Sequence, residues 1–461
     1  MSPWRRVRVV TLATLIGLSS LAAACGDGVD TPSATNLETN FEVTPQEDAA
    51  LLDSSMVDER LSSSDPAAGE YRFSGSVPEL ESLRVGQPVV IPNAGFGIVR
   101  TVTENAGETV LQVDEATLGD IIDTGTLEWD YDVSWSDFEV DLQELAVTPG
   151  FTRVRIGDMP EEPNLVYAGL PLAASDDKRK IEIEFESGGW VFKLELEPKD
   201  DRLNVDLNGS VSAKSDAAEV KMAGIVGKGW VSGFNYSSFM EFEGGAATSM
   251  STEINGLQGE MEVQWAAFRT ERETLTEIVR FEMPATLPIP LTGPFGIPFV
   301  LNLTFKGRIV PELSVPDASS GGSWKVSYTS DQGFGIESGG AQPKGSLRSQ
   351  SIDTSGETVT AGHGPAGFGV GMEFPRFELA IVGVEPFAFI TLDTYATSLW
   401  TPGTTLTSDI PPCQYGYAKI SSVAGYQLKI AGLAKFADQH TLWEKQIDKY
   451  LDGKVCTLSG E

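Results

Sequence analysis

Residues 181–196 read Ile-Glu-Ile-Glu-Phe-Glu-Ser-Gly-Gly-Trp-Val-Phe-Lys-Leu-Glu-Leu. Apolar and polar side chains alternate on both sides of Ser187-Gly188-Gly189. A period of two places every apolar side chain on one face of an extended chain. The two glycines suit a two-residue turn, because glycine adopts positive φ angles without strain. The stretch therefore predicts a β-hairpin with one buried face and one solvated face.

The same alternation recurs in both directions along the chain. Leu203, Val205 and Leu207 alternate with polar residues, and so do the apolar residues from Phe299 to Phe305. Helical periodicity is scarce between residues 150 and 412, and glycine-rich turns are frequent. We therefore predict a mainly β protein whose large domain, residues 150–412, is antiparallel and sandwich-like. The proline-punctuated stretch 284–298 predicts an edge strand or a crossover, because proline cannot donate to a central ladder.

Two smaller regions flank the predicted large domain. Residues 70–149 show short strand patterns separated by turn signals and predict a small N-terminal β-domain, with one helical turn over 117–122. Residues 413–461 begin as a strand. The sequence from Thr441 to Glu444 then resembles a capping box, and Gly453 suits a helix end. Between them Trp443, Ile447 and neighbouring apolar residues share one helical face, so we expect one C-terminal helix.

The N-terminus has the pattern of an export signal. Three arginines precede a short apolar run, and small residues then lead to Ala22-Ala23-Ala24-Cys25. This resembles the lipobox of bacterial lipoproteins. The resemblance implies that residues 1–24 are a signal peptide and that Cys25 carries the lipid, whereas an ordinary cleaved signal is the rival interpretation. Residues 25–69 are rich in small and polar residues and predict a flexible tether.

Cysteine use agrees with an exported protein. Besides Cys25, only Cys413 and Cys456 remain, and we expect them to form one disulfide that closes the C-terminal segment. Neither cysteine has a second cysteine or a histidine at metal-binding spacing, so we predict no metal site there.

Three short sequence segments carry a second resemblance, which is less specific than the lipobox. They are Val85-Gly86-Gln87-Pro88-Val89-Val90, Gly97-Ile98-Val99-Arg100-Thr101-Val102 and Asp114-Glu115-Ala116-Thr117-Leu118-Gly119-Asp120. They resemble a module of uncharacterised secreted bacterial proteins in which a small β-unit precedes a long strand-rich domain. The resemblance implies a two-part β architecture over most of residues 70–400 and transfers no activity to any residue.

Charge and histidine content exclude several classes of function. The formal net charge is −33, which disfavours binding to nucleic acid. There are two histidines, His363 in a glycine-rich loop and His440 beside the capping threonine, and no Gly-x-Ser-x-Gly elbow. We therefore predict neither Ser–His hydrolysis nor a histidine-rich metal site, and we expect no cofactor.

The carboxylate and aromatic residues are compatible with a cleft, a Ca²⁺ site or a sugar-binding surface. The acidic clusters are Glu128, Asp130 and Asp132; Asp137, Glu139 and Asp141; and Glu182, Glu184 and Glu186. Each suits a solvated strand face, a cleft or a Ca²⁺ site, although no loop has EF-hand spacing. Aromatic residues that would stack on sugar rings if exposed, and that pack in a core otherwise, are Trp129, Tyr131, Trp135, Trp190, Trp230, Trp324 and Trp400.

The leading prediction is a lipid-anchored surface or periplasmic protein that binds a glycan or a protein partner without catalysis. We expect the membrane that holds the anchor to be the outer membrane or the cell surface rather than the inner membrane. The alternatives are an extracellular glycan hydrolase that uses two carboxyl groups and a carrier of an apolar ligand between the sheets.

Overall fold

A computed structural model describes residues 37–105, 107–135, 153–156, 180–199, 201–214, 219–269, 275–283, 287–313, 318–337, 340–359, 366–382, 386, 388–401, 413–427 and 437–450. The predicted signal peptide and Cys25 lie outside these ranges, as do His363 and the acidic cluster at 137–141. Strands dominate the described residues, so the predicted mainly β fold is confirmed.

The hairpin predicted over 181–196 is present. Strand β10 (Ile181–Ser187) pairs antiparallel with β11 (Trp190–Lys199), and Ser187 lies directly opposite Trp190. The turn residues Gly188 and Gly189 have φ angles of +55° and +78°. Positive φ at both positions defines a type I′ turn, whose twist matches that of the strands.

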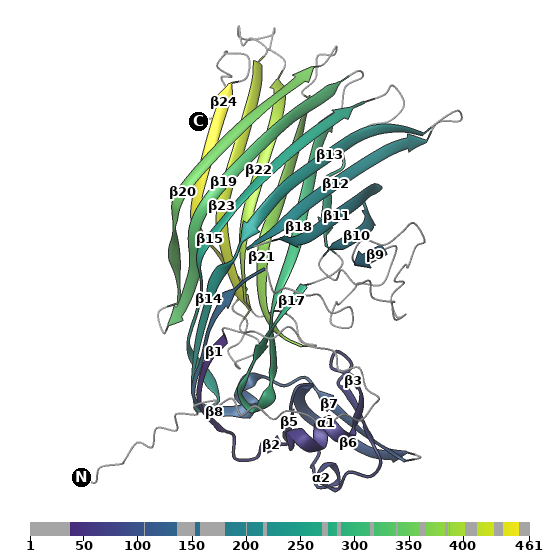
Figure 1. Ribbon diagram of the computed structural model, residues 1–461, viewed down its shortest axis with the longest axis vertical. Helices are drawn as coiled ribbons and strands as arrows, with labels where there is room; N and C mark the ends of the chain where they lie inside the picture. The colour runs from purple at the N-terminus through teal and green to yellow at the C-terminus, as the bar shows by residue number, and fades with distance from the viewer. Residues whose placement is uncertain are drawn as a thin grey trace, which may run out of the picture. The chain divides into compact units, whose positions relative to one another are not determined.

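This hairpin belongs to an eleven-stranded antiparallel sheet (Figure 1). The strand order is β1-β8-β14-β15-β13-β12-β11-β10-β9, and β19 and β20 branch from β15. The remaining strands of this sheet are β1 (Leu37–Pro45), β8 (Ile122–Val133), β9 (Arg153–Ile156), β12 (Arg202–Lys214), β13 (Glu219–Ser232), β14 (Phe234–Glu243), β15 (Ala246–Phe268), β19 (Ser319–Glu337) and β20 (Gly340–Val359).

A second antiparallel sheet has seven strands in the order β16-β18-β21-β22-β23-β24, with β17 paired to β18. Pro288 and Pro290 lie in β17, which pairs with β18 alone, so the predicted edge position of the prolines is confirmed. The strands are β16 (Val279–Glu282), β17 (Leu287–Thr292), β18 (Pro298–Leu313), β21 (Ala366–Ile381), β22 (Ala388–Thr401), β23 (Cys413–Gln427) and β24 (Ala437–Tyr450).

Aromatic rings join the inner faces of these two sheets in one core. Trp190 of β11 lies 6.4 Å from Phe368 of β21, measured between ring centroids. Phe234 of β14 lies 4.6 Å from Phe377 of β21. Period-two alternation produces this arrangement, because each strand turns its apolar side chains toward the opposite sheet.

A six-stranded sheet, order β2-β5-β6-β7-β4-β3, lies between β1 and β8 in the chain. Its strands are β2 (Ala50–Leu51), β3 (Leu61–Asp65), β4 (Glu70–Ser74), β5 (Pro88–Ile91), β6 (Gly95–Asn105) and β7 (Glu108–Asp114). The helical elements are α1 (Ser54–Arg60), α2 (Pro78–Glu81), α3 (Leu118–Ile121) and the 3₁₀ turn η1 (Pro294–Gly296). The helical turn predicted over 117–122 is therefore confirmed, with Thr117 and Asp120 as its capping box.

The predicted domain boundaries need correction at both ends of this small sheet. The predicted tether, 25–69, is wrong for residues 37–69, because β1 pairs with β8 and residues 50–65 contribute to the small sheet. The predicted small domain, 70–149, ends too late, since β8 belongs to the eleven-stranded sheet. Neither boundary is visible locally, because each is set by pairing between segments distant in the chain.

The predicted C-terminal helix is wrong. Residues 437–450 form β24, which pairs with β23 along its length, and His440 lies opposite Ala424 in this ladder. The apolar positions Trp443 and Ile447 fit a period of two as well as a helical period. The unpaired backbone groups along the edge of β23 decide between the two, because a strand satisfies them and a helix does not.

Cys413, the first residue of β23, is buried and disulfide-bonded. Cys456 lies outside the described residues, so its pairing with Cys413 stays a prediction. Among the helices that the structure describes, none has the length and apolar character required to span a membrane.

Candidate functional site: a charged cleft on the seven-stranded sheet

Most of the aromatic residues considered for sugar stacking are core residues. Trp129, Trp135, Trp190 and Trp324 are each at most 3% exposed. Tyr131, Trp230 and Trp400 are half-buried. The guanidinium of Arg202 lies 4.3 Å from the ring centre of Trp230 and covers that ring. These four buried tryptophans therefore build the core rather than a binding platform.

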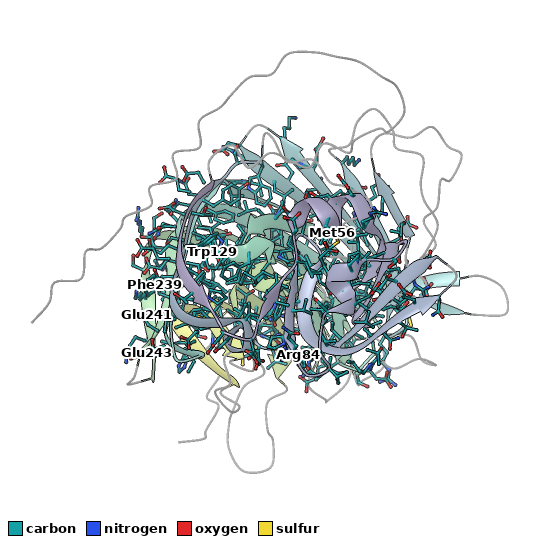
Figure 2. The ribbon with its side chains drawn as sticks, turned by 90° about the horizontal axis from the view of Figure 1, so that it is seen from below. Met56, Arg84, Trp129, Phe239, Glu241 and Glu243 are labelled. Atoms are coloured by element: carbon teal, nitrogen blue, oxygen red, sulfur yellow. The ribbon has the colours of Figure 1, made fainter. Side chains whose placement is uncertain are left out.

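The acidic cluster Glu128, Asp130 and Asp132 lies exposed on the outer face of β8. The amide nitrogen of Asn235 donates hydrogen bonds to Asp130 (2.6 Å) and Asp132 (3.1 Å). On the neighbouring strand β14, Glu241 and Glu243 are also exposed, and Figure 2 shows them at the margin of the molecule with Trp129 inward of them. Nowhere in the described ranges are three or more His, Cys, Asp or Glu side chains grouped to hold a metal ion.

In the acidic cluster Glu182, Glu184 and Glu186, Glu182 belongs to an ion-pair network. Glu182 and Glu195 lie directly opposite each other on β10 and β11. Two lysines lie between them: Lys180 reaches Glu195 at 3.2 Å, and Lys193 reaches Glu195 at 2.5 Å and Glu182 at 3.4 Å. The lysines offset the repulsion between the opposed carboxylates, which gives Glu182 a structural role.

A different cluster gathers on the outer face of the seven-stranded sheet. Strand pairing places charged side chains in two adjacent rows across β16, β18, β21, β22 and β23. One row, which we call the basic row, consists of Arg280, Arg308, Gly371, Tyr395 and Lys419. The other, the acidic row, consists of Glu282, Lys306, Glu373 and Asp393.

A cleft of about 280 Å³ opens where the two rows cross β16, β18, β21 and β22. Gly371 forms part of its floor. A Cβ atom at Gly371 would lie 2.6 Å from Nε of Arg308 and 3.1 Å from the ring of Tyr395, so only glycine admits both side chains. The polar groups that line the cleft include Arg280, Glu282, Lys306, Arg308, Glu373 and Asp393.

Arg308 is the central cation of this cleft. Its guanidinium lies 4.9 Å from the ring centre of Tyr395 and 3.6 Å from a carboxylate oxygen of Asp393. Stacking on the ring and pairing with the carboxylate hold the planar guanidinium in one orientation. The side chain remains 44% exposed, so it keeps donors available to a ligand.

Asp393 is a carboxyl group of the cleft whose pKa is shifted from its ordinary value. Burial raises the pKa of Asp393, and the negative charge of Glu373 raises it further, whereas Arg308 and Lys419 oppose these effects. Other charges of the cleft are paired within it, as in Lys306–Glu282 at 2.8 Å. A concave site that holds a carboxyl group with a raised pKa is a candidate functional site.

One void between the sheets is much smaller than the cleft. The void lined by Tyr236, Leu301, Phe377 and neighbouring residues measures about 10 Å³. A void of that size barely admits one water molecule and holds no acyl chain.

The charged cleft was not predicted from the sequence. Its residues come from four strands between positions 280 and 395, and only their pairing brings them together. One local signal exists, the alternating glycines Gly367, Gly369 and Gly371 in β21. Glycine on one face of a strand indicates a close approach of neighbouring groups, which here are the side chains of Leu399, Tyr395 and Arg308.

No known protein family, no curated protein and no solved structure matches this chain.

Proposed function

We propose that the protein is a lipid-anchored binding protein of the cell envelope and that the charged cleft holds a glycan. The observation that carries the glycan part is the mixed lining of the cleft. Carboxylates accept hydrogen bonds, and arginine and lysine donate them, within a space of about 280 Å³. A polyhydroxylated ligand both donates and accepts at every hydroxyl group, so it suits such a lining better than an apolar ligand does.

The aromatic ring at the cleft supports the same ligand class. Tyr395 lies beside the cleft, whereas Met372 and Phe281 lie beneath it and are buried in the core. Pyranose rings present C–H groups on their faces and hydroxyl groups at their edges. A tyrosine ring beside charged walls matches both parts of a pyranose ring.

The anchored location rests on the lipobox resemblance at Cys25 and on the export signal that precedes it. A net charge of −33 is compatible with a protein held near a surface by a lipid rather than by attraction to anionic head groups.

The glycan proposal is tested by titrating the purified protein with a panel of neutral and anionic polysaccharides in isothermal calorimetry. The variant Tyr395→Ala removes the ring on which Arg308 stacks and should weaken binding about tenfold, as expected for a lost ordering contact of 1–2 kcal/mol. Lys228→Ala is a matched control, because Lys228 is 75% exposed on the other sheet. Absence of binding to every polysaccharide, or equal weakening by both variants, would contradict the proposal.

A second candidate is a glycan hydrolase, favoured by one specific pair. Glu373 and Asp393 lie directly opposite each other on β21 and β22, and the pKa of Asp393 is raised. Opposed residues on neighbouring strands have Cβ atoms about 5 Å apart, so their carboxyl groups can flank one glycosidic bond, as glycosidases require. Reducing-sugar release from the same panel tests this candidate, and activity lost in both Glu373→Gln and Asp393→Asn would favour it over simple binding.

A further inference from the structure

The basic row contains two arginines that lie directly opposite each other. Arg280 of β16 is the cross-strand partner of Arg308 of β18, and both line the cleft. Like charges in directly opposed positions destabilise a sheet unless an anion lies near both. Asp393 pairs with Arg308, but none of the described residues forms an ion pair with Arg280.

The next strand contributes no side chain beside this pair. Gly371 of β21 is the partner of Arg308 on the side away from Arg280, and the side chain of Arg308 extends over it. Lys306, two residues before Arg308, lines the same cleft and is 30% exposed. Three cations therefore line the cleft together with Glu282, Glu373 and Asp393, in a chain with twice as many acidic as basic residues.

We infer that the cleft recognises an anionic substituent of its glycan, which Arg280 and Arg308 bind together. This inference rests on the proposed function and names the chemical class of the ligand. A carboxylate, sulfate or phosphate group presents two or more oxygens in the geometry that a guanidinium fork matches. The anion supplies the negative charge that Arg280 lacks and shares Arg308 with Asp393, and the hydroxyl groups of the sugar contact the acidic row.

The bulk electrostatics of the protein predict the opposite preference. A net charge of −33 repels polyanions at long range, so nonspecific binding would favour neutral glycans. A preference for an anionic glycan must therefore arise from local contacts in the cleft. Whether the anionic or the neutral form binds more tightly is thus a direct test of the inference.

The experiment compares each anionic glycan with its neutral counterpart at fixed ionic strength, by calorimetry on the whole protein. The pairs are polygalacturonate with its methyl ester, dextran sulfate with dextran, and phosphorylated mannan with unmodified mannan. We expect at least one anionic form to bind about tenfold or more tightly than its neutral form, and the pair that shows the preference identifies carboxylate, sulfate or phosphate. Free sulfate and phosphate, added as competitors, should weaken that binding.

Four variants separate recognition from folding. Arg280→Ala and Arg308→Ala should remove the preference, because they weaken binding of the anionic form about tenfold more than binding of the neutral form, whereas Arg280→Lys should restore part of it. Asp393→Asn removes the carboxylate that competes for Arg308 and should strengthen binding of the anionic form, a gain that a merely structural role would not produce. Arg348→Ala is the control, because Arg348 is 58% exposed and pairs with Asp331 on the other sheet.

The outcomes are distinguishable. If neutral and anionic forms bind equally, or if the preference survives in both arginine-to-alanine variants, the inference is overturned and the proposed glycan binding stands. If no glycan of either kind binds, the proposed function itself fails.

Discussion

The rings of Trp129 and Phe299 meet at a centroid distance of 4.9 Å and an interplanar angle of 54°. Trp129 belongs to β8 of the eleven-stranded sheet, and Phe299 belongs to β18 of the seven-stranded sheet. Trp129 also meets Phe41 of β1 edge-on at 5.4 Å. One side chain thus joins two sheets and reaches the strand at the edge of the larger one.

Replacing Trp129 by alanine should lower the free energy of unfolding by about 3–5 kcal/mol, because it leaves a large cavity between the sheets. Chemical denaturation followed by circular dichroism measures this change.

The control for that variant is Trp230→Ala. Trp230 is half-buried on the outer face, and Arg202 covers its ring at 4.3 Å, so the loss should be about 1 kcal/mol. Equal losses of unfolding free energy in the two variants would contradict a larger stabilising contribution from Trp129 than from Trp230.

At the Gly188-Gly189 turn, the stability cost of a substitution should depend on whether the new residue tolerates a positive φ angle. No atom lies within 4 Å of a Cβ built on Gly189, so the cost of a side chain there comes from its φ of +78°. Gly189→Val should cost about 1–2 kcal/mol, and Gly189→Asn should cost clearly less, because asparagine tolerates positive φ. Thermal unfolding of the two variants measures the difference, and a valine variant as stable as the asparagine variant would contradict the type I′ geometry.

Glu195 should make the stability of the fold sensitive to acid. Burial alone would raise its pKa, but the hydrogen bonds and charges of Lys193 and Lys180 outweigh burial and lower the pKa below its usual value. The stabilisation is therefore complete above pH 4.5, the usual pKa of glutamate, and is lost as the pH falls through the lowered pKa.

Glu195→Gln should consequently cost up to about 1 kcal/mol at pH 7 and nothing at a pH below both pKa values. Denaturation curves of both proteins at neutral and acid pH provide the measurement. A cost independent of pH would indicate that lost packing, not the ion pair, is responsible.

The lipobox prediction is tested by Cys25→Ala. The wild-type chain should fractionate with membranes, and the variant should appear in the soluble exported fraction, because a diacylated cysteine supplies the anchor. Unchanged membrane association of the variant would contradict a lipid at Cys25.

Local sequence patterns were sufficient to predict elements whose turns and caps form between residues close in the chain. The hairpin at 181–196 and the helical turn at Leu118–Ile121 could be predicted because their turns and caps lie within a few residues. The strand at Ala437–Tyr450 was missed because its pattern fits two periods, and only the edge of β23 selects one. The charged cleft was missed for a related reason. No window of sequence shows that Arg280 will face Arg308.

The pairing of β1 with β8 determines the order in which the chain can fold as it emerges from the ribosome. All strands of the small sheet lie between residues 50 and 114, so that sheet can close first. Strand β1 must wait for residues 122–133, and β8 then waits for β14, which begins at Phe234. Until β14 arrives, the nascent chain carries an aromatic strand whose neighbour has not been synthesised. Binding of chaperones should therefore concentrate on chains arrested between about residues 135 and 230, after the small sheet has formed and before the large sheet can close.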